Sequence, residues 1–307
     1  MYIYTILSLL FRIFVLVGLG LFLKKINLID DKIQQGLSKL LVNVFLPASV
    51  LVSASNPFEA EMVNEIIVTG IVSLIYFGLI SLLFIFVLRK IPFKMSKDKQ
   101  NVFSVLIIYA NTAFLGYPLT ENLLGSKAII LGVIHNILWS LFFFTIGISI
   151  IKGESSVKFL SIIKNPVTIS AILTLIIYLS PSRLPAIINT VLTDIGNLVT
   201  PLSMMLVGAT LSGTTLKALL RDPYSILVAV FRLLIIPISA IFLLKIFNIP
   251  ELAYKTLIIM LALPSGSMVA IHASLFNKEA DFAASSVSLN TALFAVTFPL
   301  ILFLMNL

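Results

Sequence analysis

The chain has 307 residues, of which 59% are hydrophobic and 11% charged, and its mean hydropathy is +1.13. Because a soluble domain carries about 25% charged residues, this composition excludes a soluble protein and indicates one that crosses a membrane several times. The net charge of +8 requires no nucleic-acid partner, since basic residues gather in cytoplasmic loops, and the absence of cysteine excludes disulfides, thiolate metal sites and cysteine nucleophiles.

Ten apolar runs are long enough to cross the membrane, whose ~30 Å core takes about 20 helical residues. The first run, Ile3 to Leu23, is longer than the apolar core of a signal peptide and ends at Lys24 and Lys25, so we expect it to be retained as a span. The predicted spans are 3–23, 35–55, 64–88, 102–123, 128–151, 166–180, 186–211, 224–247, 253–275 and 282–305. The predicted fold class is therefore an all-α polytopic membrane protein with ten transmembrane helices.

Basic residues in the connections predict the orientation. With ten spans both termini lie on one side, where the connections carry four Lys or Arg residues, and the opposite connections carry fourteen. Because cytoplasmic loops are enriched in Lys and Arg, we expect both termini outside the cytoplasm and the protein in the cell membrane.

Two of the runs contain residues that break a helix. The fourth holds Asn111-Thr-Ala-Phe-Leu-Gly-Tyr-Pro118, and the ninth holds Leu263-Pro-Ser-Gly-Ser-Met268. Glycine relaxes the backbone, and proline lacks an N–H and clashes with the preceding turn. Lipid cannot satisfy the backbone groups that a break leaves unpaired, so each break is expected to lie inside the protein or along a water-filled cavity.

Matching positions in the two halves indicate an internal repeat. Asn43-x-x-x-Pro47-x-Ser49 recurs 154 residues later as Asn197-x-x-x-Pro201-x-Ser203, and the same offset joins Asn136 to Asn290 and Asn111 to Ser265. Five spans in each copy is an odd number, so the copies must insert in opposite orientations, as in many secondary transporters. We predict a first repeat at 1–151, a cytoplasmic connection at 152–165 and a second, inverted repeat at 166–307.

The two breaks are the expected substrate site. A helix that begins in mid-membrane presents unpaired N–H groups and about half a positive charge, which suits an anion. The expected lining is Asn111, Thr112, Pro118, Pro264, Ser265, Gly266 and Ser267. The alternative is a pair of proline kinks whose backbone groups are satisfied by neighbouring helices.

Polar and charged residues within the other spans are further candidates. Asn43 and Asn197 either bind the substrate or bond one helix to another. Arg232 could bind a carboxylate with two hydrogen bonds, and Arg12 and Asp194 could carry charge for ion coupling. Alternatively, Asp194 forms an ion pair with one of the two arginines, or the arginine side chains extend to the lipid headgroups.

The two histidines, His135 and His272, could carry a proton during transport or simply pack through hydrogen bonds. Neither has a metal-ligating residue four positions on, and the sequence contains no hydrolase, zinc-protease or nucleotide-binding motif. We therefore expect no enzyme activity, no catalytic residue, no metal and no cofactor, and we leave open whether H+ or Na+ is a coupling ion.

Several of these segments also resemble the auxin efflux carrier family. The resemblance rests on Tyr109 to Pro118, on the block from Leu261 to Ala270, on Asp281 to Ser288, on Asn290-Thr291 and on Thr297-Phe-Pro299. It implies a ten-span fold of two inverted five-span repeats, similar to sodium/bile-acid symporters, in which broken spans four and nine cross. The short central connection is similar to the compact prokaryotic members, which include malate and malonate permeases.

The sequence thus predicts a secondary transporter of small organic anions such as carboxylates, which works by alternating access in a lipid bilayer. The alternative is a ligand-sensing receptor or scaffold that keeps the transporter fold without turnover, and a membrane-embedded enzyme ranks third. Substrate identity, transport direction and a homodimeric state are left open.

Overall fold

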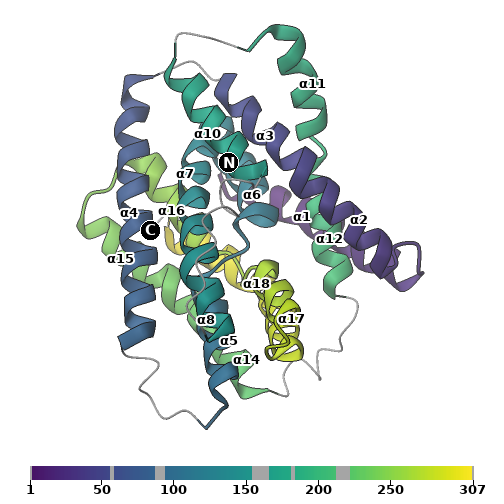
Figure 1. Ribbon diagram of the computed structural model, residues 1–307. Helices are drawn as coiled ribbons and strands as arrows, with labels where there is room; N and C mark the ends of the chain where they lie inside the picture. The colour runs from purple at the N-terminus through teal and green to yellow at the C-terminus, as the bar shows by residue number, and fades with distance from the viewer. Residues whose placement is uncertain are drawn as a thin grey trace.

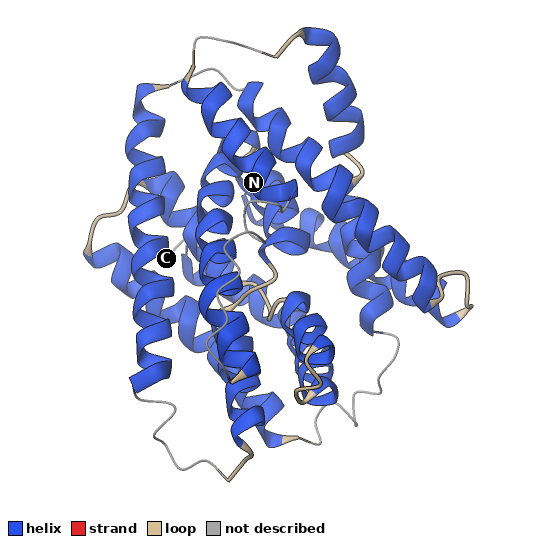
Figure 2. Ribbon diagram, viewed as in Figure 1, coloured by secondary structure: helices blue, strands red, loops and turns tan. Residues whose placement is uncertain are grey.

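The computed structural model describes residues 2–55, 59–86, 94–153, 166–180, 184–211 and 222–305. Throughout these ranges the chain is helical, and helices are joined by short loops (Figure 2). Most of the connection expected at 152–165 and the end of the third predicted span at 87–88 lie outside the described residues.

The first half begins with the helix α1 (Tyr2–Lys25) and a continuous run of α2 (Asp31–Leu40), the π-helical turn η1 (Leu41–Phe45), α3 (Leu46–Val52) and the 3-10 turn η2 (Ser53–Ser55). The helix α4 (Ala60–Phe86) follows, and then α5 (Lys97–Ile108), the π-helical turn η4 (Thr112–Gly116) and α6 (Tyr117–Leu124). The last run of this half is α7 (Ser126–Phe142), η5 (Phe143–Gly147) and α8 (Ile148–Lys152).

The second half contains α10 (Pro166–Leu179), α11 (Ala186–Gly196) and α12 (Val199–Leu211). A run of α14 (Pro223–Val230), η6 (Phe231–Ile235) and α15 (Ile236–Ile246) comes next. The half ends with α16 (Glu251–Ala262), α17 (Ser267–Leu275) and α18 (Ala280–Met305).

Six helical runs in the described part of the chain are long and apolar enough to cross a membrane. They are 31–55, 60–83, 126–152, 186–211, 223–246 and 280–305, and Pro166–Leu179 is a shorter apolar helix. The fourth and ninth predicted spans are each divided between two shorter helices, α5 and α6 or α16 and α17. The prediction of an all-helical polytopic membrane protein is therefore confirmed in its class, whereas the number of spans stays a prediction.

Local sequence explains where several helices begin. The side chains of Asp30, Ser96 and Asp222 accept hydrogen bonds from backbone N–H groups in the first turns of α2, α5 and α14, which are the groups that lack a partner within the helix. Gly125, with φ +86°, forms the turn between α6 and α7, a conformation that glycine adopts without strain.

Three of the π-helical turns end two residues before a proline. Pro47 follows η1, Pro118 follows η4 and Pro237 follows η6. A proline removes one N–H from the helical ladder and presses on the carbonyl one turn earlier, and a wider turn relieves that clash. Pro118 therefore lies within a continuous helical run, because η4 passes directly into α6; the loss of helix is at 109–111, and Pro118 is associated with the π-helical turn that precedes it.

The helices pack as two groups, which contact each other where α10 meets α7 and where α12 meets η4. In one, α1 lies along α12 and α3 packs against α10 and α11; in the other, α7 packs against α4 and α16, and α18 packs against α14 and α17. Figure 1 shows α2 and α11 at one edge of the molecule and α4 and α15 at the opposite edge. The helices that end at the interruptions, α5 and α16, pack in the second group, α5 against α14 and α18 and α16 against α7 and α18.

The contact between α1 and α12 depends on two glycines. A Cβ on Gly20 would lie 1.9 Å from the backbone oxygen of Met205, and one on Gly208 would lie 1.9 Å from that of Val17. These distances are far inside van der Waals contact, so neither position accepts a side chain without separating the helices. Small residues allow helix backbones to approach closely in membranes, and here they hold the first group together.

Candidate functional site

The chain is not helical where α5 and α16 end, and the two interruptions lie against each other. Ala110 and Ser265 form an isolated antiparallel bridge. Its two hydrogen bonds run from the Asn111 N–H to the Pro264 carbonyl and from the Gly266 N–H to the Tyr109 carbonyl, each 2.8 Å long. The backbone groups freed by the loss of helix are thus satisfied within the protein, as the absence of water inside a membrane requires. We call this contact the crossing.

The residue types at the crossing suit its geometry. Pro264 has no N–H and cannot continue α16, and its carbonyl is the group that accepts from Asn111. Gly266 passes so close to the facing segment that a Cβ there would lie 2.9 Å from the backbone oxygen of Ala110. Asn111 ends the extended segment and accepts a hydrogen bond from the Phe114 N–H through Oδ1, at 3.4 Å.

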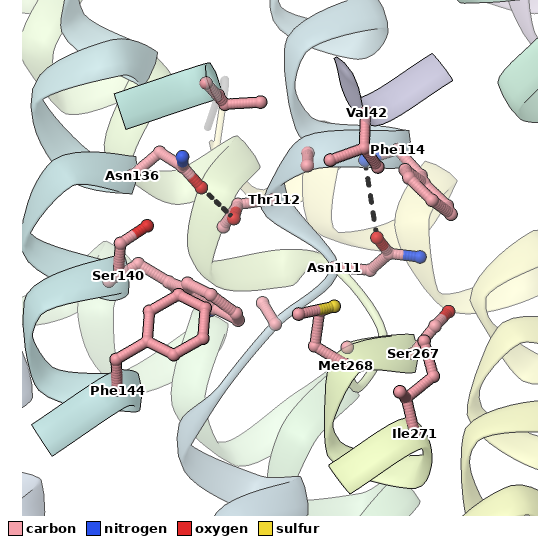
Figure 3. A pocket seen from close by; sticks show the side chains of 15 residues that line it. Val42, Asn111, Thr112, Phe114, Asn136, Ser140, Phe144, Ser267, Met268 and Ile271 are labelled. Carbon is pink, nitrogen blue, oxygen red and sulfur yellow. Dashed lines mark hydrogen bonds between the residues drawn. The ribbon is translucent and has the colours of Figure 1, made fainter. Parts of the chain in front are cut away.

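A pocket of about 80 Å³ lies beside the crossing. Its polar side chains are Asn111, Thr112, Asn136, Ser140 and Ser267. Large apolar side chains surround them: Val42, Phe114, Trp139, Phe144, Val167 and Ile271. Figure 3 shows Asn136 and Ser140 on one side of the pocket and Asn111 and Ser267 on the other.

The pocket contains the beginnings of two helices. Thr112 starts η4, which continues into α6, and Ser267 starts α17; Ala113 and Met268, the second residue of each, also line the pocket. The first N–H groups of a helix lack partners within it and carry a partial positive charge. In α17 no side chain caps them.

The polar side chains in the pocket are arranged by neighbouring groups. Thr112 donates a hydrogen bond of 2.6 Å from Oγ1 to Asn136 Oδ1, which links the start of η4 to α7. Among the residues that the structure describes, those that line the pocket include no Asp, Glu, Lys, Arg or His. Helix ends, amides and hydroxyls therefore provide the polarity of the pocket, and no carboxylate from the described part of the chain lines it to repel an anion.

Ser265 and Pro264 are at the crossing but do not line the pocket. Ser265 is completely buried; its hydroxyl donates to the Leu106 carbonyl at 2.8 Å and accepts from Asn290 Nδ2 at 2.6 Å. Pro118 is buried in α6 outside the pocket lining. Of the seven residues expected at the breaks, the structure brings Asn111, Thr112, Gly266 and Ser267 together around the pocket.

Arg232 lies at the crossing, but its side chain turns to backbone carbonyls and not to the pocket. It is fully buried and hydrogen-bonds to carbonyls at the ends of α5 and α16. The other expected polar residues of the spans do not line the pocket. Asn43 is exposed and donates to the Lys39 carbonyl of its own helical run at 2.7 Å, and Asn197 is exposed at the end of α11.

The remaining charge candidates also lie outside the pocket lining. Arg12 on α1 and Asp194 on α11 are exposed, so the structure does not bring Asp194 to Arg232. His135 is buried and shares a 2.8 Å hydrogen bond with the Ser73 hydroxyl. His272 bonds through Nδ1 to the Met268 carbonyl of its own helix at 2.8 Å. Among the described residues no cluster of three or more His, Cys, Asp or Glu side chains could hold a metal ion.

Sequence reasoning did not place Asn136, Ser140, Trp139 and Phe144 in the site. All four come from α7 and η5, a continuous run with no helix breaker at these positions. Asn136 alone carried a signal, because it matches Asn290 at the repeat offset. The other three become recognisable only when α7 is packed against the crossing.

Comparison with known proteins gives matches along nearly the whole chain. A family model described as membrane transport protein matches residues 5–159 and 155–302. An uncharacterized transporter of Methanocaldococcus jannaschii is 24% identical over an alignment of 289 positions that covers 91% of this chain and 92% of the relative. An uncharacterized transporter of Methanothermobacter thermautotrophicus is 25% identical over an alignment of 306 positions that covers 96% of this chain and 96% of the relative.

Proposed function

This chain belongs to the membrane transport protein family, the family of the auxin efflux carriers that its interrupted segments resemble, and from that premise we propose that it is a secondary transporter of small organic anions. The anion, a carboxylate in the first instance, would bind in the pocket beside the crossing. The observation that carries the proposal is that two helices begin in this pocket and that its lining, in the ranges that the structure describes, has no acidic side chain.

The site suits a carboxylate with a short apolar body. The first N–H groups of η4 and α17 offer donors and positive potential to the carboxylate, with Asn111 and Ser267 beside them. Val42, Phe144 and Val167 offer apolar contact on the remaining walls. The pocket of about 80 Å³ is larger than the roughly 10–15 Å³ that one buried water needs, so it has room for a small organic anion.

We propose further that the fold consists of ten spans in two inverted repeats, at 1–151 and 166–307. The repeat offset supports this: α5 and α16 begin 154 residues apart (97 and 251) and end 154 residues apart (108 and 262), and α7 and α18 also begin 154 residues apart (126 and 280). The antiparallel direction of the bridge at the crossing is what inverted copies would produce. By the loop charges, both termini would lie outside the cytoplasm, in the cell membrane.

Alternating access would come from movement of one packing group against the other. Val42 of η1 and Val167 of α10 reach the pocket from the side of the first group, and the crossing, η4, α7, η5 and α17 form the rest of its lining. A substrate bound there would lie between the two groups, so their relative movement could expose it to either side of the membrane. The tight contact between α1 and α12 would keep the first group rigid.

Transport by purified protein in liposomes tests the function. The liposomes would be loaded with malonate, malate, succinate or an aromatic acid, and counterflow of the labelled acid would be measured against its uncharged amide analogue and against protein-free liposomes. We expect saturable counterflow of at least one acid and none of the amides. Binding without counterflow would favour a receptor, and a folded protein that neither binds nor moves any of the acids would refute the proposal.

A further inference from the structure

Arg232 is a buried cation with no carboxylate partner among the described residues. It lies in η6, and none of its surface is exposed. An arginine cannot be neutralised by deprotonation, and burial of an isolated charge is costly unless it is paired. Its surroundings must therefore supply the compensation in another form.

Backbone carbonyls supply it. Arg232 Nε donates to the Leu263 carbonyl at 2.8 Å, Nη2 donates to the Leu261 carbonyl at 2.9 Å and, more weakly, to that of Met260 at 3.4 Å, and Nη1 donates to the Ile107 carbonyl at 3.3 Å. Nη1 also donates to the Tyr76 hydroxyl at 3.0 Å, and that hydroxyl donates to the Ile108 carbonyl at 3.2 Å.

These carbonyls come from the last turns of both interrupted helices. Ile107 and Ile108 end α5, and Met260 and Leu261 lie in the last turn of α16. The final carbonyls of a helix lack N–H partners and carry about half a negative charge. Two such ends meet at the crossing, so without a cation their partial charges would repel each other in a region that water and lipid do not neutralise.

The crossing is therefore polarised. Its carbonyl ends face the guanidinium of Arg232, while the helix beginnings at Thr112 and Ser267 face the pocket. A set of converging carbonyl oxygens is also the ligand type that hard cations take, and at interrupted membrane helices such ends hold coupling ions. Here one planar side chain with five donors fills that place.

We propose that the carbonyl set at the crossing is a cation site that the chain fills with its own guanidinium. Arg232 then acts as a resident cation that holds α5 and α16 together, and the crossing has no vacant place for a coupling cation. The proposal goes beyond the transport function: it concerns what neutralises the crossing, and it holds for a receptor or a transporter of any substrate.

Chemical rescue tests it. Purified Arg232→Ala is expected to melt roughly 10 °C below the unmodified protein, because removal of one partner from a buried charge network is strongly destabilising. Guanidinium chloride at a few millimolar, far below its denaturing range, should recover a large part of the loss. Urea at the same concentration has a similar shape but no charge and should recover none. The melting temperature in sodium or potassium chloride is compared with that in choline chloride, whose cation is too large to enter the space left by the arginine side chain.

The outcomes separate the role of charge from that of shape. Rescue by guanidinium, or by sodium or potassium beyond choline, supports a cation site. Equal rescue by urea and guanidinium, no rescue by any cation, or a variant as stable as the unmodified protein would each overturn the proposal. Arg12→Ala is the matched control, since Arg12 is exposed, and it should melt unchanged and show no response to guanidinium.

A second pair of variants covers the case in which Arg232→Ala does not fold. Arg232→Lys keeps the charge with fewer donors, and Arg232→Gln keeps polar donors without the charge. We expect the lysine variant to melt above the glutamine variant, and the reverse order would refute a cation role. Melting is measured without substrate, so this result is independent of whether the liposome experiment succeeds.

Discussion

Replacement of Gly266 by alanine would test how tightly the crossing is packed. The new Cβ would lie 2.9 Å from the backbone oxygen of Ala110 and 3.3 Å from that of Tyr109. Gly266 has φ −70° and ψ 133°, which alanine adopts freely. The substitution therefore causes no backbone strain of its own, and its whole effect comes from contact with the facing segment.

The expected loss of stability follows from the hydrogen bonds that the new Cβ would stretch. Separation of the two segments stretches the Gly266–Tyr109 and Asn111–Pro264 hydrogen bonds, both now 2.8 Å. A buried polar group left unsatisfied costs about 1–3 kcal/mol, and overpacking by one methyl group costs about 1–3 kcal/mol. Because the segments can relax by a few tenths of an ångström, we expect a combined loss of about 2–4 kcal/mol.

Thermal unfolding in detergent, followed by intrinsic fluorescence, measures the effect. Gly18→Ala is the matched control: the site has no atom within 4 Å of the new Cβ, and alanine is favoured over glycine within a helix by about 0.5–1 kcal/mol. The control should melt at or above the temperature of the unmodified protein. If Gly266→Ala melts at or above the temperature of the unmodified protein, as the control should, the two segments do not approach each other closely at the crossing. The pocket that depends on that approach would then be refuted as the binding site.

Three further predictions concern single residues. Asn111→Ala should weaken carboxylate binding about 5–10-fold in a calorimetric titration, through loss of roughly one hydrogen bond. Asn43 is exposed, so Asn43→Ala should leave the affinity unchanged, and equal affinities of the two variants would remove Asn111 from the site. Gly208→Ala places a Cβ 1.9 Å from a backbone oxygen of α1, so its melting temperature should fall, and an unchanged value would contradict the α1–α12 contact. Ser265→Ala should cost about 1–3 kcal/mol of stability with substrate affinity retained, because its hydroxyl bonds inside the crossing; a loss of affinity at unchanged stability would place it in the pocket.

The membrane class and the places where helices are interrupted could be predicted from the sequence. Hydropathy alone decides which segments lipid accepts. Pro264 and Gly266 act on the backbone of their own segment, so their effect is local and readable, and Asn111 marks a helix beginning because its side chain caps the turn that follows it. The repeat offset was also readable, and the helix bounds recur at the same spacing.

What each of these residues contacts was decided by the tertiary structure. Ser265 and Ser267 are two positions apart, yet one bonds inside the crossing and the other lines the pocket, because Ser265 lies in the bridge and Ser267 begins a helix. The partners of Arg232 come from α5 and α16, about 125 and 30 residues away in the chain. A buried charge is compensated by whichever dipoles the packing brings to it, and no local pattern in the sequence specifies them.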